Sequence, residues 1–295
     1  MVRDPERLFS ELKKKRVGVV GLGVSHFALI RLMLKKGIGV TVLDKREMEA
    51  LGEDGRTLEK EGARFILGDG YLDALTSFDV LFRTPGMYFL SDALNKARAA
   101  GVSVVSEMEV FFDLCPCRVF AVTGSDGKTT TSTLISEFFK AEGKTVHLGG
   151  NIGRALLPQI EEIKPEDICV VELSSFQLIS MRQSPDVAVV TNVAPNHLDV
   201  HRDMQEYIDA KKNILLHQNG FSRTVLNFEN TVTREEMAPL VRGELCWFSK
   251  ERPVENGSFL RGDGMLCRVR HGEAAPVVHR DEIRIPGMHN VDNFL

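Results

Sequence analysis

Apolar runs alternate with amphipathic stretches along the first hundred residues. Residues 16–21 form an apolar run that ends in a glycine turn, and residues 27–36 follow with helical spacing. Further apolar runs with the character of buried strands cover residues 39–44, 78–82 and 102–105. Strands that alternate with helices are typical of a parallel sheet covered by helices. The pattern predicts an α/β fold.

The alternation restarts after Cys115-Pro116-Cys117, so we expect one domain over residues 1–115 and a second over residues 116–295. The second domain has a predicted helix at 129–141 and predicted strands at 118–123, 145–148, 168–173 and 187–193. Beyond residue 220 the strands become short, at 224–227 and 245–248, and Arg261-Gly-Asp-Gly264 predicts a hairpin turn. The second domain is therefore also α/β, with a different final third.

Composition limits the possible partners. A chain of 295 residues is long enough for two domains that each bury a core. Its net charge of -4 argues against non-specific nucleic-acid binding, while leaving room for a local basic pocket. The five cysteines form neither a disulfide framework nor a zinc motif. Without a signal peptide or a membrane-spanning run, we expect a cytoplasmic protein with no membrane partner.

The strongest chemical motif is Gly124-Ser-Asp-Gly-Lys-Thr-Thr130, which follows a β-branched strand and opens a helix. In that position a glycine-rich turn cradles phosphate, because backbone N–H groups and the helix dipole favour an anion and Lys128 adds a charge. The hydroxyl of Thr129 is placed to hold Mg²⁺. The motif lacks the glycine that the longer P-loop pattern has at the position of Val122. A strand–turn–helix with a chance Gly-Lys-Thr is the weaker alternative.

A second glycine turn, Gly21-Leu-Gly23, follows the first strand, and Asp44 ends the second strand. This resembles a dinucleotide fingerprint, except that His26 occupies the third glycine position. A nicotinamide cofactor, another nucleotide on the same frame and a tight turn without function all remain open.

Acidic and histidine residues follow two later strands. Glu172 ends one strand and is a natural Mg²⁺ ligand there, although a solvated acid at a strand end is common. His197, Asp199 and His201 follow the next strand, where a structural role and contact with metal or substrate both remain open. Lys211 and Lys212 lie on the following predicted helix, and the pattern alone singles out neither.

Six motifs in this order resemble the Mur ligases over essentially the whole chain. They are GSDGKTT, GGNIG (149–153), ELSSFQL (172–178), NHLDVH (196–201), YIDAK (207–211) and PGMHNVDN (286–293). ELSSFQL resembles the type that adds D-glutamate. The resemblance implies a Rossmann-like domain for a UDP-sugar followed by a P-loop-type ATPase domain. It also implies ATP-dependent ligation of D-glutamate to UDP-N-acetylmuramoyl-L-alanine in peptidoglycan synthesis, for cell-wall growth and division, by a monomer.

The resemblance also implies roles for individual residues. Lys128, His197 and Lys211 would be catalytic, and Lys211 would be carbamylated. Two Mg²⁺ ions would be bound by Thr129, Glu172, His197 and Lys211. ATP would contact Gly124, Ser125, Asp126, Gly127, Lys128, Thr129, Thr130, Asn290 and Asn293. The UDP-sugar would contact Val24, Ser25, Asp44, Lys45, Arg46, Thr84, Pro85, Gly86 and Asn151.

The sequence departs from the family pattern at three places. Asp126 stands where asparagine is usual and places a negative charge beside the phosphates, and His26 replaces a small residue in the UDP loop. Family members continue into a third domain that contacts D-glutamate, so we expect residues 1–295 to bind substrates without turnover. The alternatives are a nucleotide-binding module without catalysis, a folylpolyglutamate synthase relative and, least favoured, a nicotinamide oxidoreductase.

Overall fold

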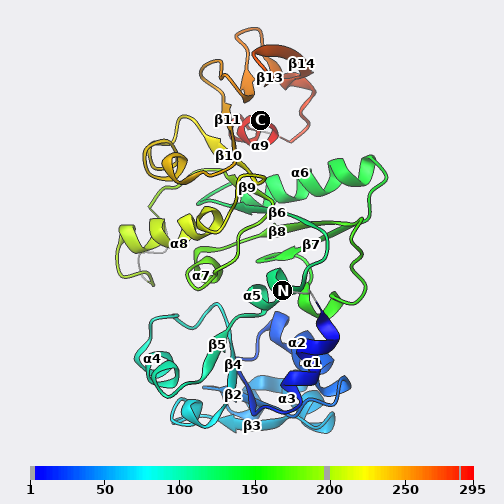
Figure 1. Cartoon of the computed structure of the whole chain (residues 1–295), viewed down its shortest axis with the longest axis vertical. Helices are drawn as coiled ribbons and strands as arrows, with labels where there is room; N and C mark the ends of the chain where they lie inside the picture. The colour runs from blue at the N-terminus through cyan, green and yellow to red at the C-terminus, as the bar shows by residue number, and fades with distance from the viewer. Residues whose placement is uncertain (1–3, 196–199, 286) are drawn as a thin grey trace. The chain divides into compact units, whose positions relative to one another are not determined.

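The computed structural model describes residues 4–195, 200–285 and 287–295. The chain divides into two compact units (Figure 1). The first comprises Met1–Pro116 with Arg154–Lys164, and the second comprises Cys117–Gly153 with Pro165–Leu295. The predicted boundary at 115/116 thus leaves out a return segment, residues 154–164, which belongs to the first unit. None of the helices in the described part of the chain combines the length and apolar character needed to cross a membrane.

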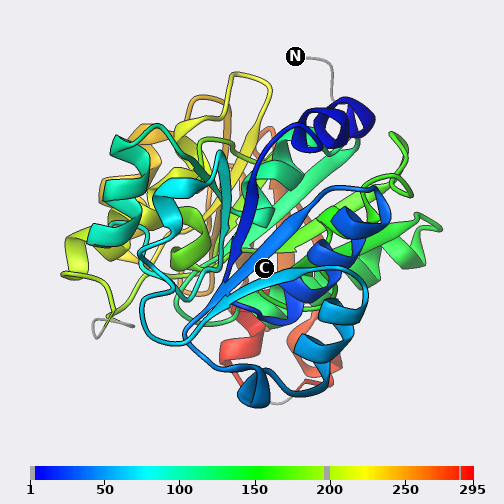
Figure 2. The same ribbon diagram turned by 90° about the horizontal axis from the view of Figure 1, so that it is seen from below.

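The first unit is built on a five-stranded parallel sheet in the order β3-β2-β1-β4-β5. Its strands are β1 (Val17–Val20), β2 (Val40–Asp44), β3 (Arg64–Leu67), β4 (Val80–Arg83) and β5 (Ser103–Val105). Both views show α2 (Val24–Lys35) and α3 (Met48–Lys60) on one side of this sheet and α4 (Asp92–Ala99) on the other (Figure 2). The chain order reverses between β1 and β4, which makes a crevice at the carboxyl ends of these strands a natural ligand site.

The predicted strands of the first unit are confirmed as β1, β2, β4 and β5. They were readable because strands covered on both faces are continuously apolar, as in the fully buried Val17–Val20. The pattern did not predict β3, an edge strand whose residues are only partly buried or exposed. It also did not predict α1 (Pro5–Leu12) or α5 (Glu107–Leu114).

The return segment is anchored to α5 by a buried carboxylate. The Leu157 backbone N–H donates to Glu107 Oε1 over 2.8 Å, at the start of the short helix η2 (Leu157–Gln159). The ammonium of Lys36, the residue that follows α2, also pairs with Glu161 at 2.5 Å. Burial raises the pKa of Glu107 to about 7, although the N–H groups of Leu157 and Leu156 oppose the shift. The anchor therefore contains a carboxyl group that titrates near neutral pH.

The second unit is built on a nine-stranded sheet in the order β14-β13-β12-β11-β10-β9-β6-β8-β7. Adjacent strands from β12 to β7 are parallel, and β13 and β14 are antiparallel additions. The strands are β6 (Arg118–Thr123), β7 (Val146–Gly150), β8 (Ile168–Glu172), β9 (Val187–Val190), β10 (Arg223–Asn227), β11 (Glu244–Ser249), β12 (Gly257–Leu260), β13 (Met265–Arg270) and β14 (Glu273–His279).

Helices cover both faces of the central part of this sheet. In Figures 1 and 2, α6 (Lys128–Ala141) lies on one side, while α8 (Met204–Leu216), which packs against α7 (Ser175–Leu178), lies on the other. The hairpin predicted at residues 261–264 is confirmed between β12 and β13, and the short strands predicted after residue 220 are β10 and β11. Because β6, β8 and β9 are parallel, the residues that follow them emerge at one edge.

We predict a pH-dependent stability from Glu107. Its pKa is 4.5 in a model peptide and about 7 in the fold, so between these values the native state keeps a proton that the unfolded chain has lost. Stability contributed by this group therefore falls as pH rises from 4.5 to 7, by about 3 kcal/mol at most. Glu107→Gln, which keeps an acceptor oxygen, should lose this decline and be more stable than the wild type above pH 7.

The measurement is urea unfolding followed by circular dichroism between pH 5 and 8. Fluorescence of Trp247, the sole tryptophan and a residue of the second unit, identifies the transition of that unit separately. Glu53→Gln, an exposed change in the first unit, is the control. Parallel pH profiles of wild type and Glu107→Gln would contradict the assignment.

Candidate functional site

The loop between β6 and α6 (residues 124–127) makes a close approach to the segment that follows β9. Gly124 has φ 153°, and a Cβ atom there would overlap the Thr191 hydroxyl and crowd the Asn192 backbone. Gly127 is left-handed, at φ 78°, and begins α6. A glycine loop that opens a helix directs backbone N–H groups and the positive end of the helix dipole to one place. The predicted phosphate cradle therefore has the required local geometry.

The segment after β9 holds this loop by hydrogen bonds. Asn192 Oδ1 accepts from the backbone N–H groups of Ser125 at 3.1 Å and Asp126 at 3.0 Å. The Thr191 hydroxyl donates to the Asp126 carbonyl at 2.5 Å. The side chain of Asp126 is exposed, so its negative charge faces solvent rather than the anchoring segment.

Two of the predicted metal residues, Thr129 and Glu172, are in contact at the carboxyl edge of the sheet. Lys128 Nζ donates to the Ser125 carbonyl at 2.8 Å. The Thr129 hydroxyl donates to Glu172 Oε2 at 2.7 Å, and Asn151 Nδ2 donates to Glu172 Oε1 at 2.8 Å. A buried carboxylate beside a hydroxyl is an oxygen donor set of the kind that Mg²⁺ prefers. Thr129 and Glu172 thus fit a magnesium ion.

The two adjacent lysines of α8 have different surroundings. Lys211 is 1% exposed, and its Nζ donates to the Gly124 carbonyl at 2.8 Å and lies 3.3 Å from Thr123 Oγ1. Burial, together with the smaller effect of the nearby Lys128 charge, lowers the pKa of Lys211 to about 7. Lys212 instead pairs with Asp209 at 3.0 Å and Glu236 at 2.8 Å. Of the two lysines, it is Lys211 that contacts the loop at residues 124–127.

The structure describes only part of the predicted motif at residues 196–201. His197 and Asp199 lie outside the described residues. His201 is buried, with Nε2 2.8 Å from Ser175 Oγ, Nδ1 3.4 Å from Glu206 and its ring stacked on Phe176. These contacts describe a structural histidine that fixes α7 against α8.

Asn290 and Asn293 lie on α9 (His289–Phe294), which packs against α6. Asn293 Oδ1 accepts from the Thr131 hydroxyl at 3.2 Å, and its Nδ2 donates to Asn290 Oδ1 at 2.9 Å. A Cβ atom on Gly127 would collide with Asn293. The two asparagines therefore lie beside the start of α6, where Thr130 also lies.

The first unit has a pocket at the switch point of its sheet. It is lined by the last residues of β1 and β2, by the loops that follow β1, β2 and β4, and by two residues from the loop after β3: Val20, Gly21, Leu22, Gly23, Asp44, Lys45, Arg46, Tyr71, Leu72, Thr84, Gly86 and Met87. Gly21 has φ 82°, and a Cβ atom there would crowd the Thr84 side chain, so glycine permits the close approach of two pocket walls.

Asp44 and Arg46 bind the pocket loops together. Asp44 is buried and accepts from the Leu22 N–H at 2.8 Å and from Arg46 Nη2 at 2.7 Å. Arg46 Nη2 also donates to the Leu22 carbonyl at 2.6 Å. Burial opposes ionisation of Asp44, but the hydrogen bonds from Arg46 and Leu22 outweigh it and lower the pKa of Asp44.

Not every residue predicted for the UDP-sugar lines this pocket. Lys45, Thr84 and Gly86 line it with Asp44 and Arg46, whereas Val24, Ser25 and Pro85 are adjacent in sequence and absent from the lining. Val24 is 92% exposed at the start of α2. Asn151 belongs to the second unit, where it contacts Glu172.

Two buried polar residues that bond to the backbone of this pocket's lining were not predicted to support it. Arg83 Nη1 donates to the Met87 carbonyl at 2.9 Å and to the Thr84 carbonyl at 3.2 Å, which shapes the loop after β4. His26 Nδ1 lies 2.7 Å from the Gly21 carbonyl. Burial lowers the pKa of His26 to about 4, so a neutral imidazole donates this bond. The sequence signal that could have identified Arg83 is its position as a charged residue at the end of an otherwise apolar strand.

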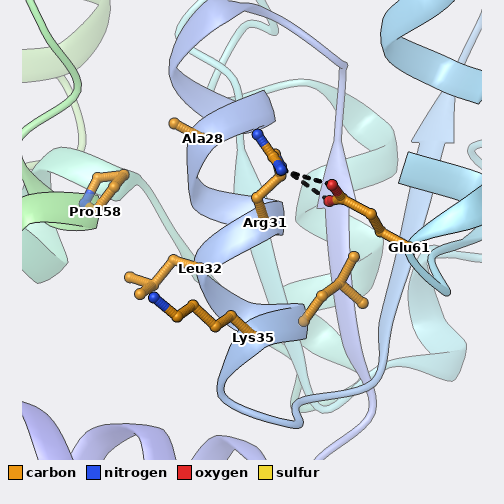
Figure 3. A pocket seen from close by; sticks show the side chains of 7 residues that line it. Ala28, Arg31, Leu32, Lys35, Glu61 and Pro158 are labelled. Carbon is orange, nitrogen blue, oxygen red and sulfur yellow. Dashed lines mark hydrogen bonds and ion pairs between the residues drawn. The ribbon is translucent and has the colours of Figure 1, made fainter. Parts of the chain in front are cut away.

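A second hollow of the first unit, beside α2, has a partly exposed lining. It is lined by Ala28, Arg31, Leu32, Leu34, Lys35, Glu61 and Pro158 (Figure 3). Arg31 points toward Glu61 and pairs with it at 2.7 Å. The charged residues of this lining are exposed, so none is a buried group that would orient a ligand.

Both units match domain families of known proteins. The Mur ligase middle domain matches residues 122–295, and the Mur ligase MurD-like, N-terminal domain matches residues 15–106. The solved structure of UDP-N-acetylmuramate:L-alanyl-gamma-D-glutamyl-meso-diaminopimelate ligase from Neisseria meningitides has a TM-score of 0.61 to this chain at 18% identity. That likeness covers 95% of this chain and 90% of the other, and it shows a shared fold.

Two curated relatives carry the name UDP-N-acetylmuramoylalanine--D-glutamate ligase. The protein of Acetivibrio thermocellus is 48% identical over 97% of this chain and 61% of its own length. The protein of Clostridium botulinum is 48% identical over 100% of this chain and 63% of its own length. The chain therefore spans a little over three fifths of these relatives. Because the middle-domain match alone covers more than half of the sequence, the chain belongs to the Mur ligase family.

Proposed function

We propose that this chain carries the nucleotide and UDP-sugar sites of an ATP-dependent ligase that joins D-glutamate to UDP-N-acetylmuramoyl-L-alanine in peptidoglycan synthesis. The observation that carries the proposal is the hydrogen bond from Thr129 to Glu172 at the start of α6, directly after Lys128 of the glycine-rich motif. The names of the relatives at 48% identity support the choice of substrates.

The reaction has two steps. The γ-phosphoryl group of ATP passes to an oxygen of the alanyl carboxylate, which releases ADP and leaves an acyl phosphate. The amine of D-glutamate then attacks the acyl carbon, an amide bond forms, and phosphate leaves while the amine loses a proton. Phosphoryl transfer of this kind depends mainly on positioning and on stabilisation of charge.

The second unit would supply the nucleotide site. Lys128 would leave the Ser125 carbonyl to neutralise the transferred phosphoryl group, and the loop N–H groups would bind the neighbouring phosphates. Thr129 and Glu172 would hold one Mg²⁺ ion, while His197 and a carbamylated Lys211 would hold a second. When bound, these ions neutralise charge on the phosphates. Asn290 and Asn293 would lie near the base.

Carbamylation would change Lys211 from a buried amine into an oxygen ligand. An ammonium group offers no lone pair to a metal, whereas the added carboxylate does. The burial of Lys211 beside the Gly124 carbonyl places this amine next to the predicted phosphate loop. The exposed lysines of the chain lack that placement, and Lys212 is committed to two carboxylates.

The first unit would bind the UDP-sugar in the pocket at the switch point of its sheet. Asp44, Lys45 and Arg46 would contact the nucleotide part, with Thr84, Pro85 and Gly86 on the facing loop. Val24 and Ser25 at the start of α2 would receive the diphosphate, because a helix N-terminus favours an anion. Asn151 would contact the sugar from the second unit.

The reaction itself is tested with the product of the whole gene. We predict equal amounts of ADP, phosphate and UDP-N-acetylmuramoyl-dipeptide from ATP, the UDP-sugar and labelled D-glutamate. Lys128→Ala should slow the reaction by about a hundredfold or more, because charge on the transferred phosphoryl group loses its partner. Lys140→Ala, at the exposed far end of the same helix, should react normally. Wild-type rates for Lys128→Ala would contradict the assignment of Lys128 to the nucleotide site.

For the first unit, we predict that Arg46→Ala weakens binding of UDP-N-acetylmuramoyl-L-alanine by about tenfold. The change removes a guanidinium that binds both Asp44 and the Leu22 carbonyl at the pocket wall. Titration calorimetry on this chain measures the dissociation constant. Arg31→Ala, which breaks an exposed ion pair between α2 and the end of α3, is the matched control. Equal affinities for Arg46→Ala and wild type would contradict the proposal that this pocket binds the UDP-sugar.

For Lys211, we predict that Lys211→Ala lowers ADP formation by about a hundredfold or more, because loss of an outer-shell partner of a metal already costs about tenfold to a hundredfold. Formate or acetate should restore part of the rate by supplying a carboxylate. Lys212→Ala should neither lose comparable activity nor respond to formate. Carbamylation would be contradicted by two results together. A mass spectrum of the active protein in bicarbonate would show no adduct of carbon dioxide at Lys211, and formate or acetate would fail to restore activity.

A further inference from the structure

The Ser125 hydroxyl is the centre of a buried hydrogen-bond cluster behind the predicted phosphate loop. Ser125 Oγ donates to the Ala194 carbonyl at 2.8 Å and accepts from the Ala194 N–H at 2.9 Å. Its third contact is the Tyr207 hydroxyl at 2.9 Å. A serine hydroxyl has one proton and two lone pairs. Since the proton is engaged by Ala194, the Tyr207 hydroxyl donates to Ser125.

The Tyr207 hydroxyl is held in place by the packing of its ring. The side chain is 1% exposed, lies edge-on to His201 at 5.4 Å between ring centroids, and has Lys211 Nζ 4.7 Å from its own centroid. Ser125 is 6% exposed. A hydrogen bond between two buried and rigid groups fixes their separation, and loss of the donor leaves a lone pair without its partner.

The cluster joins three elements that carry predicted site residues. Ser125 belongs to the loop before Lys128, Ala194 lies on the segment that leads toward His197, and Tyr207 lies one turn before Lys211 on α8. The same loop is held separately by Asn192 through backbone N–H groups. Asn192 thus fixes the path of the backbone, whereas Tyr207 ties the Ser125 side chain to α8, beside the bond from Lys211 to the Gly124 carbonyl.

We infer that Tyr207 is a positioning residue for nucleotide binding, which acts through Ser125 to hold the phosphate loop in its binding conformation. The inference rests on the proposed function, because its effect is on the affinity for nucleotide. It assigns Tyr207 no contact with substrate. A loop that must be ordered on binding pays for that ordering from the binding free energy, so a loosened loop binds more weakly.

The test uses Tyr207→Phe, which removes one oxygen atom and keeps the ring. Titration with the ATP analogue adenylyl imidodiphosphate in MgCl₂ should show about tenfold weaker binding than in the unaltered chain. Affinity for UDP-N-acetylmuramoyl-L-alanine, which would bind the first unit, should be unchanged. Trp247 fluorescence during urea unfolding verifies that the second unit of the variant is folded.

A double-variant comparison separates positioning from general weakening of the fold. If Tyr207 acts through Ser125, the variant with both Ser125→Ala and Tyr207→Phe should bind the analogue no more weakly than Ser125→Ala alone. Thr224→Val is the matched control, since it removes another buried hydroxyl of this unit, one that donates to Gln218 at 2.6 Å. It should lower stability without changing nucleotide affinity.

The outcomes are distinguishable. If the unaltered chain binds the analogue and Tyr207→Phe binds it equally well, this inference is wrong and the proposed function stands. Additive effects of Ser125→Ala and Tyr207→Phe, or an equal loss of affinity in Thr224→Val, would also overturn it. If the unaltered chain binds no analogue at all, the nucleotide site and this inference fail together.

Discussion

The close approach of the loop at residues 124–127 to the end of β9 is the constraint on which the second unit depends. Only a glycine at position 124 allows it, because a side chain would overlap Thr191. The approach brings the loop carbonyls and N–H groups within reach of Asn192, Thr191 and Lys211. Parallel strands place all of these groups at one edge, so the sheet topology is what makes the cluster possible.

Burial of ionisable groups at this edge has a cost that the fold offsets locally. Lys211 loses its hydration on burial, and it donates hydrogen bonds to Gly124 and Thr123 instead. Burial and the nearby charge of Lys128 both disfavour the charged form of its amine. Glu172 is equally buried but accepts from Thr129 and Asn151. Such arrangements of desolvated lysine and carboxylate are characteristic of functional sites rather than of stable cores.

Much of the fold could be predicted from the sequence because buried parallel strands are continuously apolar, as in residues 17–20 and 168–172. The edge strand β3 was not predicted, because its partly exposed residues do not form a continuous apolar run. The phosphate loop was also predictable, because its chemistry lies within seven consecutive residues. Lys211 was distinguished from Lys212 only by family resemblance, since the difference is one of burial. Ser125 and Tyr207 meet across 82 residues, and no local pattern reports such a contact.

The central claim is that nucleotide phosphates bind at the start of α6, and not at the glycine turn of the first unit. A crystal structure of the chain grown with ADP and MgCl₂ tests it most directly. The account predicts the β-phosphate within hydrogen-bond distance of Lys128 and the loop N–H groups, with the metal bound to the Thr129 hydroxyl beside Glu172. Nucleotide density in the pocket lined by Gly21, Gly23 and Asp44, with none at residues 124–130, would contradict it.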